Sequence, residues 1–205
     1  MIITLKKLIK IKMLRKTIIL AFLGPDGAGK STYIKKISQN LKKKKINLVN
    51  YHLYPNFFKK KKPVIVSNPH SKIPRSEFTS FLKLFYWLIK YHFFLILIKK
   101  ISKKIIIFDR HAYDILIDPV RYRFKLNKKL TNSILKLFPK PDLWVIVTNH
   151  PSVIWKRKKE VKYKVLVKQV RSYNMLSKKF KNSIVCRNFS DIKKILEYLI
   201  KNYEI

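Results

Sequence analysis

The sequence contains very little cysteine and few acidic residues. Its one cysteine, Cys186, stands in a short apolar run, so no disulfide can form within the chain, and we expect a buried thiol and a reducing, cytoplasmic location. No apolar stretch reaches the roughly 20 residues that a membrane-spanning helix needs. Residues 84–98 come nearest, but Lys90 and His92 interrupt them. We therefore predict a long core helix there and no transmembrane segment.

The shortage of acid leaves a net charge of +38, from 48 Lys and Arg against 10 Asp and Glu. Such a charge suits binding to nucleic acid or to an anionic membrane. However, 40 of the basic residues are Lys, and they accompany many Ile, Asn and Phe, which is typical of an AT-rich genome. Runs such as 42–45 and 59–62 lack the interleaved aromatics and arginines of base recognition. We expect a solvated surface that attracts nucleotides and does not recognise nucleic acid specifically.

The sequence has only three glycines, and all three lie in one stretch. Residues 24–31 match G-x-x-x-x-G-K-[ST], the P-loop pattern, between an apolar strand and a helix. The glycines let backbone N–H groups turn toward a phosphate. Lys30 can then reach the β- and γ-phosphates of ATP, and Ser31 can offer its hydroxyl to Mg²⁺. The positive end of the helix dipole faces the same anion.

A second motif ends another expected strand. Asp109 and Arg110 directly follow the apolar residues 105–108. Beside a P-loop, the carboxylate can hold the Mg²⁺ shell or accept a proton from the attacking oxygen, and the guanidinium can clamp an acceptor phosphate. The alternative is an Asp–Arg pair that caps the following helix.

Strands and helices alternate along the chain. We expect strands at 18–23, 46–51, 104–108, 143–148 and 183–186, and helices at 29–41, 75–102, 112–118, 127–138, 151–159, 164–181 and 191–202. Apolar strands separated by helices predict an α/β protein with the P-loop NTPase fold, a five-stranded parallel sheet with helices on both faces. Ligands of such a sheet bind at the carboxyl ends of the strands, where both motifs lie.

The domain organisation is simple. We expect residues 17–205 to form a single domain, because a chain of 205 residues with 47% hydrophobic content can bury one substantial core. Residues 1–16 form a basic extension. This extension is either a membrane-surface helix or a stretch upstream of the working start at Met13, and we favour the second interpretation.

These motifs resemble those of the thymidylate kinase family of P-loop nucleoside-monophosphate kinases. The matching features are the loop at 24–32, Asp-Arg-His at 109–111, and Pro-Asp-Leu followed by a strand and P-x-x-x-x-x-R-K at 141–158. The resemblance implies an ATP- and Mg²⁺-dependent phosphotransferase that moves the γ-phosphoryl group to a small acceptor. It also implies a short lid near 156–165 and dimerisation through a helix face.

The resemblance further implies roles for individual residues. The loop residues would bind ATP: Gly24, Pro25, Asp26, Gly27, Ala28, Gly29, Lys30, Ser31 and Thr32. The catalytic residues would be Lys30, Asp109, Arg110 and Arg157, of which Asp109 would share Mg²⁺ with Ser31. Asp26 and Arg110 would contact the acceptor. Because arginine is scarce here, Arg75 and Arg121 are further acceptor candidates, with surface salt bridges as the alternative.

The sequence leaves the acceptor open. Thymidylate kinases carry Arg-Glu-Pro-Gly after the second strand, whereas residues 51–55 read Tyr-His-Leu-Tyr-Pro, and the chain is similar to a divergent branch of the family. The acceptor can be dTMP, another nucleotide or a sugar compound. A true dTMP kinase is therefore one alternative, and an ATP-binding protein that lacks catalysis or associates with nucleic acid is another.

Overall fold

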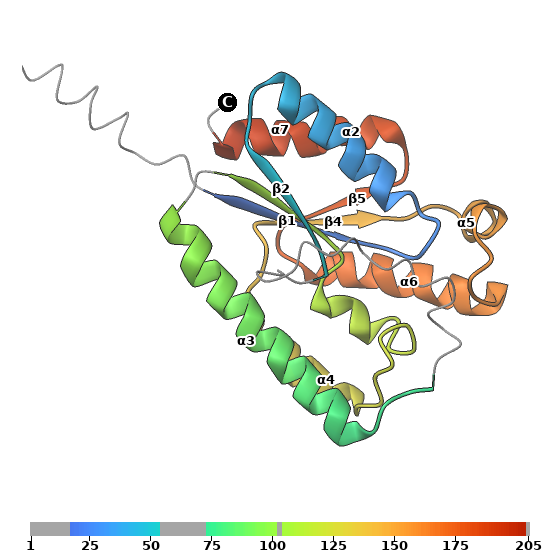
Figure 1. Cartoon of the computed structure of the whole chain (residues 1–205). Coiled ribbons are helices and arrows are strands. Elements are labelled where there is room, and N and C mark those ends of the chain that lie inside the picture. Colours follow the sequence, from blue (N-terminus) through green and yellow to red (C-terminus); the bar gives the residue numbers. More distant parts are fainter. Residues whose placement is uncertain (1–16, 54–72, 102–103, 204–205) are drawn as a thin grey trace, which may run out of the picture.

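The computed structural model describes residues 17–53, 73–101 and 104–203 and has a central sheet with helices on both faces (Figure 1). The strands are β1 (Ile18–Leu23), β2 (Leu48–His52), β3 (Ile105–Asp109), β4 (Leu143–Val147) and β5 (Ser183–Cys186). They are all parallel and lie in the order β2-β3-β1-β4-β5. The predicted five-stranded sheet is therefore confirmed. The basic extension at 1–16 and the lysine run at 59–62 lie outside the described residues.

The central strands are fully apolar because both of their faces are covered. All of β1 is buried, and so is β4. In the register, Phe22 of β1 pairs with Asp109 of β3, and the Arg110 N–H donates to the Phe22 carbonyl over 2.9 Å. The P-loop and the Asp-Arg motif therefore leave the sheet side by side, although residues 32–108 lie between them in the sequence.

The helices divide between the two faces of the sheet. They are α2 (Lys30–Lys43), α3 (Glu77–Ile101), η2 (Ala112–Leu116), α4 (Lys128–Lys136), α5 (Pro151–Arg157), α6 (Tyr163–Lys179), η3 (Phe189–Asp191) and α7 (Ile192–Tyr203). In Figure 1, α2 and α7 lie on one face, and α3 and α4 lie on the other. The segment predicted as a helix at 112–118 is a short 3-10 helix. Cys186 is fully buried, as its apolar surroundings predicted.

Helix α3 has one buried face and one exposed face. Leu84, Trp87 and Tyr91 pack into the core with at most 2% exposure. The other face exposes large apolar side chains: Phe78, Phe81, Leu82, Phe85, Tyr86, Ile89, Phe93 and Ile96. By length and composition alone, residues 77–97 could cross a membrane, with a mean hydropathy of 1.3 and 33% of the apolar window buried. The predicted core helix is thus a core helix on one side only.

Asp191 holds the start of α7. Its Oδ1 accepts a hydrogen bond from Lys194 Nζ over 2.7 Å. Its Oδ2 accepts from the backbone N–H groups of Arg187 and Asn188 over 2.9 and 3.1 Å. These hydrogen bonds, that of Lys194 foremost, lower the pKa of Asp191 to about 2. The ionised carboxylate therefore stabilises the turn that leads from β5 into α7.

We expect Asp191→Asn to lower the free energy of unfolding near neutral pH by about 1 kcal/mol, because the amide lacks the charge that strengthens the hydrogen bonds to Lys194 and to the two backbone N–H groups. Because the pKa of Asp191 is lower in the folded protein than in the unfolded chain, the carboxylate contributes fully above about pH 4. Its contribution is lost as the pH falls through about 2. Denaturant unfolding at several pH values measures the difference. Glu197→Gln, an exposed site on α7, is the control and should change little; equal stability of wild type and Asp191→Asn near neutral pH would contradict the prediction.

Candidate active site

A cavity of about 920 Å³ opens beside the P-loop, at the carboxyl ends of the strands. Its wall is built by the loop itself, by residues at the ends of β2 and β3, by residues that follow β4 and β5, and by the segments after η2 and between α5 and α6. The lining residues are Asp26, Gly27, Ala28, Gly29, Lys30, Ser31, Thr32, Tyr33, His52, Asp109, Arg110, Arg121, Tyr122, Asn149, Arg157, Lys158, Glu160, Arg187, Asn188 and Phe189. The two predicted motifs therefore share one cavity.

The P-loop backbone needs its glycines. Gly24, Gly27 and Gly29 have φ angles of +145°, +80° and +99°, which side chains rarely allow. Gly24 also approaches β4 closely, since a Cβ built on it would lie 2.0 Å from the Val147 carbonyl oxygen. A Cβ on Gly29 would meet nothing within 4 Å. Gly24 is thus required by packing as well as by backbone conformation.

Lys30 is drawn back into the loop. Its Nζ donates to the carbonyl oxygens of Gly24 and Pro25 over 2.7 and 2.8 Å, and the residue is 7% exposed. Burial, with the Arg110 guanidinium nearby, lowers the pKa of Lys30 to about 7. The two carbonyl oxygens are neutral acceptors. An anion that entered the loop would form a stronger, charge-assisted hydrogen bond with this ammonium group.

One carboxylate oxygen of Asp109 has no hydrogen-bond partner among the described residues. Within the described part of the chain, its Oδ1 is buried and makes no hydrogen bond. The Ser31 hydroxyl, a second oxygen, lines the same cavity. Among residues 17–53, 73–101 and 104–203, no group of three His, Cys, Asp or Glu residues could hold a metal alone. This donor set fits Mg²⁺, which binds oxygen, keeps several waters and shares the phosphates of its substrate.

Arg110 is fixed at both edges of its guanidinium. Its backbone is left-handed, with φ +79°, and the residue is 4% exposed. Nη1 donates to Asp114 Oδ2 over 3.0 Å, and Nη2 donates to Asp26 Oδ1. Asp114 lies behind the cavity and Asp26 lies on its wall. The arginine therefore links the core to the P-loop.

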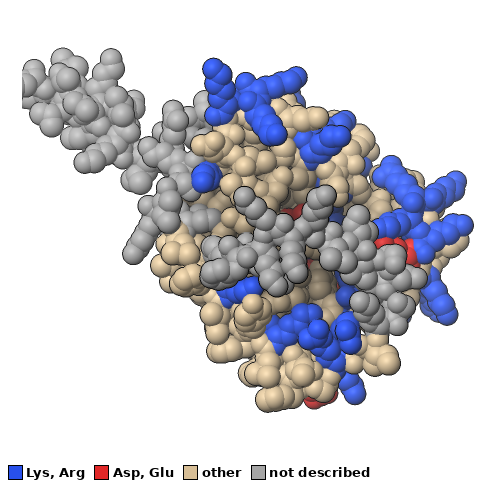
Figure 2. All heavy atoms as spheres, viewed as in Figure 1, with Lys and Arg blue, Asp and Glu red and all other residues tan. Residues whose placement is uncertain are grey.

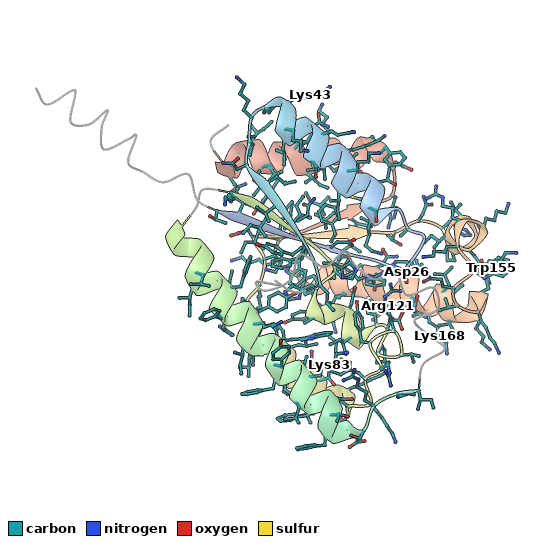
Figure 3. The ribbon with its side chains drawn as sticks, viewed as in Figure 1. Asp26, Lys43, Lys83, Arg121, Trp155 and Lys168 are labelled. Atoms are coloured by element: carbon teal, nitrogen blue, oxygen red, sulfur yellow. The ribbon has the colours of Figure 1, made fainter. Side chains whose placement is uncertain are left out.

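Arg121 continues this linkage toward the segment after α5. It forms ion pairs with Asp26 and, over 3.5 Å, with Glu160, which also pairs with Lys158 over 2.5 Å. Figure 3 shows Arg121 next to Asp26 beside the P-loop. We call the resulting row of alternating charges the ion-pair chain; it consists of Asp114, Arg110, Asp26, Arg121, Glu160 and Lys158. All members of the ion-pair chain except Asp114 line the cavity.

The other predicted residues fall in three places. Arg157 and Thr32 line the cavity, whereas Gly24 and Pro25 do not. Arg75 lies outside the cavity, in an exposed stretch before α3, where its N–H donates to the Arg123 carbonyl over 3.0 Å. Its contact with an acceptor remains a prediction. His111 is 1% exposed within the core, where burial lowers its pKa to about 3 and keeps the ring neutral.

Sequence reasoning missed several lining residues. Asn149 and Arg187 shortly follow β4 and β5, so the rule that ligands bind at strand ends could have found them. Phe189 packs against Tyr33 with ring centroids 5.3 Å apart, and Lys36 Nζ lies 3.9 Å from its ring. Glu160 gave no signal, because one acid within a lysine-rich segment resembles an ordinary solvated charge.

The family model for thymidylate kinase matches residues 22–192. The chain belongs to the thymidylate kinase family. Thymidylate kinase from Candida albicans is 19% identical, with a TM-score of 0.58 over 92% of this chain and 94% of that one. Deoxyadenosine kinase from M. mycoides is 18% identical, with a TM-score of 0.53 over 90% and 100%. At these identities the likeness shows the P-loop NTPase fold alone. A search of curated proteins finds no match.

The family assignment confirms the resemblance seen in the sequence, and the protein is a P-loop nucleotide kinase. The motifs that carried the resemblance lie within the matched residues and meet at the cavity. The family does not by itself define the acceptor.

We expect Gly24→Ala to destabilise the thymidylate kinase-like fold more than Gly29→Ala. Alanine at 29 adds only backbone strain, about 1–2 kcal/mol for a left-handed residue. Alanine at 24 adds backbone strain of its own, because φ is +145° there, and a clash with the Val147 carbonyl. The free energies of unfolding, measured with denaturant, should differ by about 2 kcal/mol or more. Equal stabilities would show that β4 moves away freely, contrary to the close packing seen here.

Proposed function

We propose that the protein uses Mg²⁺ and ATP to phosphorylate a small nucleotide-like acceptor. The observation that carries this proposal is the single cavity that joins the P-loop to the ion-pair chain. One end offers phosphate-binding backbone and Lys30, and the other offers arginines on a carboxylate. This arrangement suits a donor and an acceptor that meet between the two ends.

At the donor end, the loop backbone and Lys30 bind the ATP phosphates. Ser31 and Asp109 hold the metal, and the unpartnered Asp109 oxygen supports this role. Mg²⁺, when bound, lowers the repulsion between the phosphates and the attacking oxygen. Arg157, at the end of α5, neutralises charge that develops on the transferred group. These assignments follow the roles that the resemblance implied.

At the acceptor end, Arg110 and Arg121 converge on the Asp26 carboxylate. Two guanidinium groups around one carboxylate can also bind an acceptor phosphate, because phosphate and carboxylate accept the same paired N–H donors. Asp26 is then free to accept a hydrogen bond from an acceptor hydroxyl. The acceptor class that suits both interactions is a nucleoside monophosphate, with dTMP as one member.

The segment at 156–165 acts as the lid of the domain formed by residues 17–205. It contributes Glu160 to the cavity wall, and Glu160 pairs with Arg121 on the opposite side. A closed lid excludes water, which would otherwise hydrolyse ATP. The protein works in the cytoplasm, where its buried Cys186 stays reduced.

The first experiment measures ADP formation from ATP by the full chain, with and without Mg²⁺, over a panel of acceptors. The panel holds the four common deoxynucleoside monophosphates, their nucleosides, and sugars with their phosphates. We expect Lys30→Ala to lower the turnover by about a hundredfold or more, because it removes a charge from the transferring phosphates. Its melting temperature should stay close to that of the wild type. Lys43→Ala, at the far end of α2 (Figure 3), is the control.

The same panel separates the alternatives. Stimulation by dTMP alone identifies a dTMP kinase, and stimulation by a sugar compound moves the acceptor class away from nucleotides. ATP binding without turnover favours the non-catalytic interpretation. Binding to unrelated DNA that weakens with salt would favour a nucleic-acid-associated protein. Figure 2 shows Lys and Arg in several groups on the face that it draws.

We also propose that a second copy of the chain covers the exposed face of α3, as the resemblance implied. Leu82, Phe85, Ile89 and Ile96 are at least 47% exposed and are spaced by three, four and seven residues, the pattern of a helix seam. This seam holds no charged residue, so it suits an apolar partner despite the net charge of the chain. Crossing a membrane would instead pull Leu84, Trp87 and Tyr91 out of the core.

We expect Phe85→Lys to convert a dimer into a monomer, since a buried unpaired ammonium group at the seam is costly. Light scattering after size exclusion measures the mass. Met175→Lys, on α6 with 54% exposure, is the control and should leave the mass unchanged. A wild-type monomer at micromolar concentration, or binding of the wild type to anionic vesicles through α3, would overturn the dimer proposal.

A further inference from the structure

Asp114 is a fully buried carboxylate with three hydrogen-bond donors around it. Its Oδ2 accepts from Arg110 Nη1 over 3.0 Å and from the Tyr122 hydroxyl over 3.1 Å. Its Oδ1 accepts from the Tyr173 hydroxyl over 2.9 Å. The donors come from the end of β3, from the segment after η2, and from α6. The Asp114 side chain thus connects three separate segments of the fold by hydrogen bonds, and Asp114 is 0% exposed.

A buried carboxylate of this kind is weak evidence for a role in stability. A buried ion pair pays for the loss of water around both charges, and well-packed apolar side chains are often as stable. Asp114 touches no part of the cavity itself. Its charged partner, Arg110, does line the cavity and is the arginine that the proposed function places on the acceptor. The connection between Asp114 and the reaction therefore runs through Arg110.

The two carboxylate partners of Arg110 differ in their access to solvent. Asp114 holds the inner nitrogen, Nη1, in the core, whereas Asp26, with 16% side-chain exposure, meets the outer nitrogen, Nη2, at the cavity. The backbone N–H of Arg110 is also fixed, since it donates to the Phe22 carbonyl over 2.9 Å. A molecule in the cavity can replace Asp26 at Nη2. It cannot reach Nη1, because that nitrogen faces the core.

We propose that Asp114 is a positioning residue for phosphoryl transfer: it fixes the inner edge of the Arg110 guanidinium, so that the outer edge meets the acceptor where Asp26 now lies. Tyr122 and Tyr173 orient the carboxylate, one on each oxygen. This inference rests on the proposed function, because it assumes that Arg110 contacts the acceptor. It predicts an effect on the acceptor that is separate from the effect on ATP.

The test compares Asp114→Asn with the wild type as full chains. The acceptors are dTMP, dAMP, dCMP and dGMP and their nucleosides, each varied at saturating Mg-ATP. We expect kcat/KM for the acceptor to fall about a hundredfold. A guanidinium held on one side only can shift by about 1 Å, and a shift of that size at a reacting group costs about this much. The KM for ATP, measured at saturating acceptor, should stay within about twofold, since the P-loop keeps its own contacts.

Two further variants keep the test decisive. Tyr173→Phe removes one hydrogen bond to Asp114 from outside the cavity and should lower kcat/KM for the acceptor about threefold to tenfold. It carries the test if Asp114→Asn does not fold. Asp142→Asn is the matched control, because Asp142 Oδ2 accepts from the Ile19 N–H at the opposite end of the sheet. It should leave both constants unchanged.

Each outcome has one meaning. A selective loss for the acceptor in Asp114→Asn and Tyr173→Phe supports the positioning role. An active wild type whose variants lose nothing, or lose ATP and acceptor constants equally, overturns the positioning role and leaves the proposed function standing. A wild type that phosphorylates none of the four monophosphates overturns the proposed nucleotide acceptor, and the inference falls with it.

Discussion

The pairing of Arg110 with two carboxylates is the interaction on which the site depends. A guanidinium that is 4% exposed stays in place only if anions and hydrogen-bond acceptors replace its water. Asp114 does this from η2 and Asp26 does it from the P-loop. One side chain thereby ties the phosphate-binding loop to the element that follows β3. The wall of the cavity depends on that tie, because Arg110 and its partner Asp26 both line it.

The parallel sheet makes this pairing possible. β1 and β3 are neighbours and end at the same level, so the residues after them emerge together. The left-handed backbone of Arg110, whose N–H bonds to the Phe22 carbonyl, then turns the guanidinium toward the P-loop. An antiparallel neighbour would place the Asp-Arg motif at the opposite edge. The topology thus selects which charges can meet, and local conformation decides how they meet.

The predictable features are those that depend on local pattern. The P-loop, the five strands and the placement of Asp109 follow from motif spacing and from apolar runs, which carry their signal within a few residues. Asp114, Glu160 and the partners of Arg121 depend instead on how η2 and the segment after α5 pack against the P-loop. The sequence predicts the same role for Arg75 and Arg121, yet only Arg121 lines the cavity. The sequence also did not show which face of α3 is exposed, because large apolar residues occur on all sides of that helix.

The few acidic residues of the chain are concentrated at the cavity. The chain has 10 acidic and 48 basic residues, yet three of the acids line the cavity and Asp114 lies directly behind it. On a solvated surface a lysine costs little, since water and salt screen it. Beside Arg110, Arg121 and the buried Lys30, a further cation would be poorly screened and would repel each of them. Surface charge in this protein can therefore drift toward lysine, whereas Asp26 and Glu160 must remain acids for the cavity to hold Arg110 and Arg121.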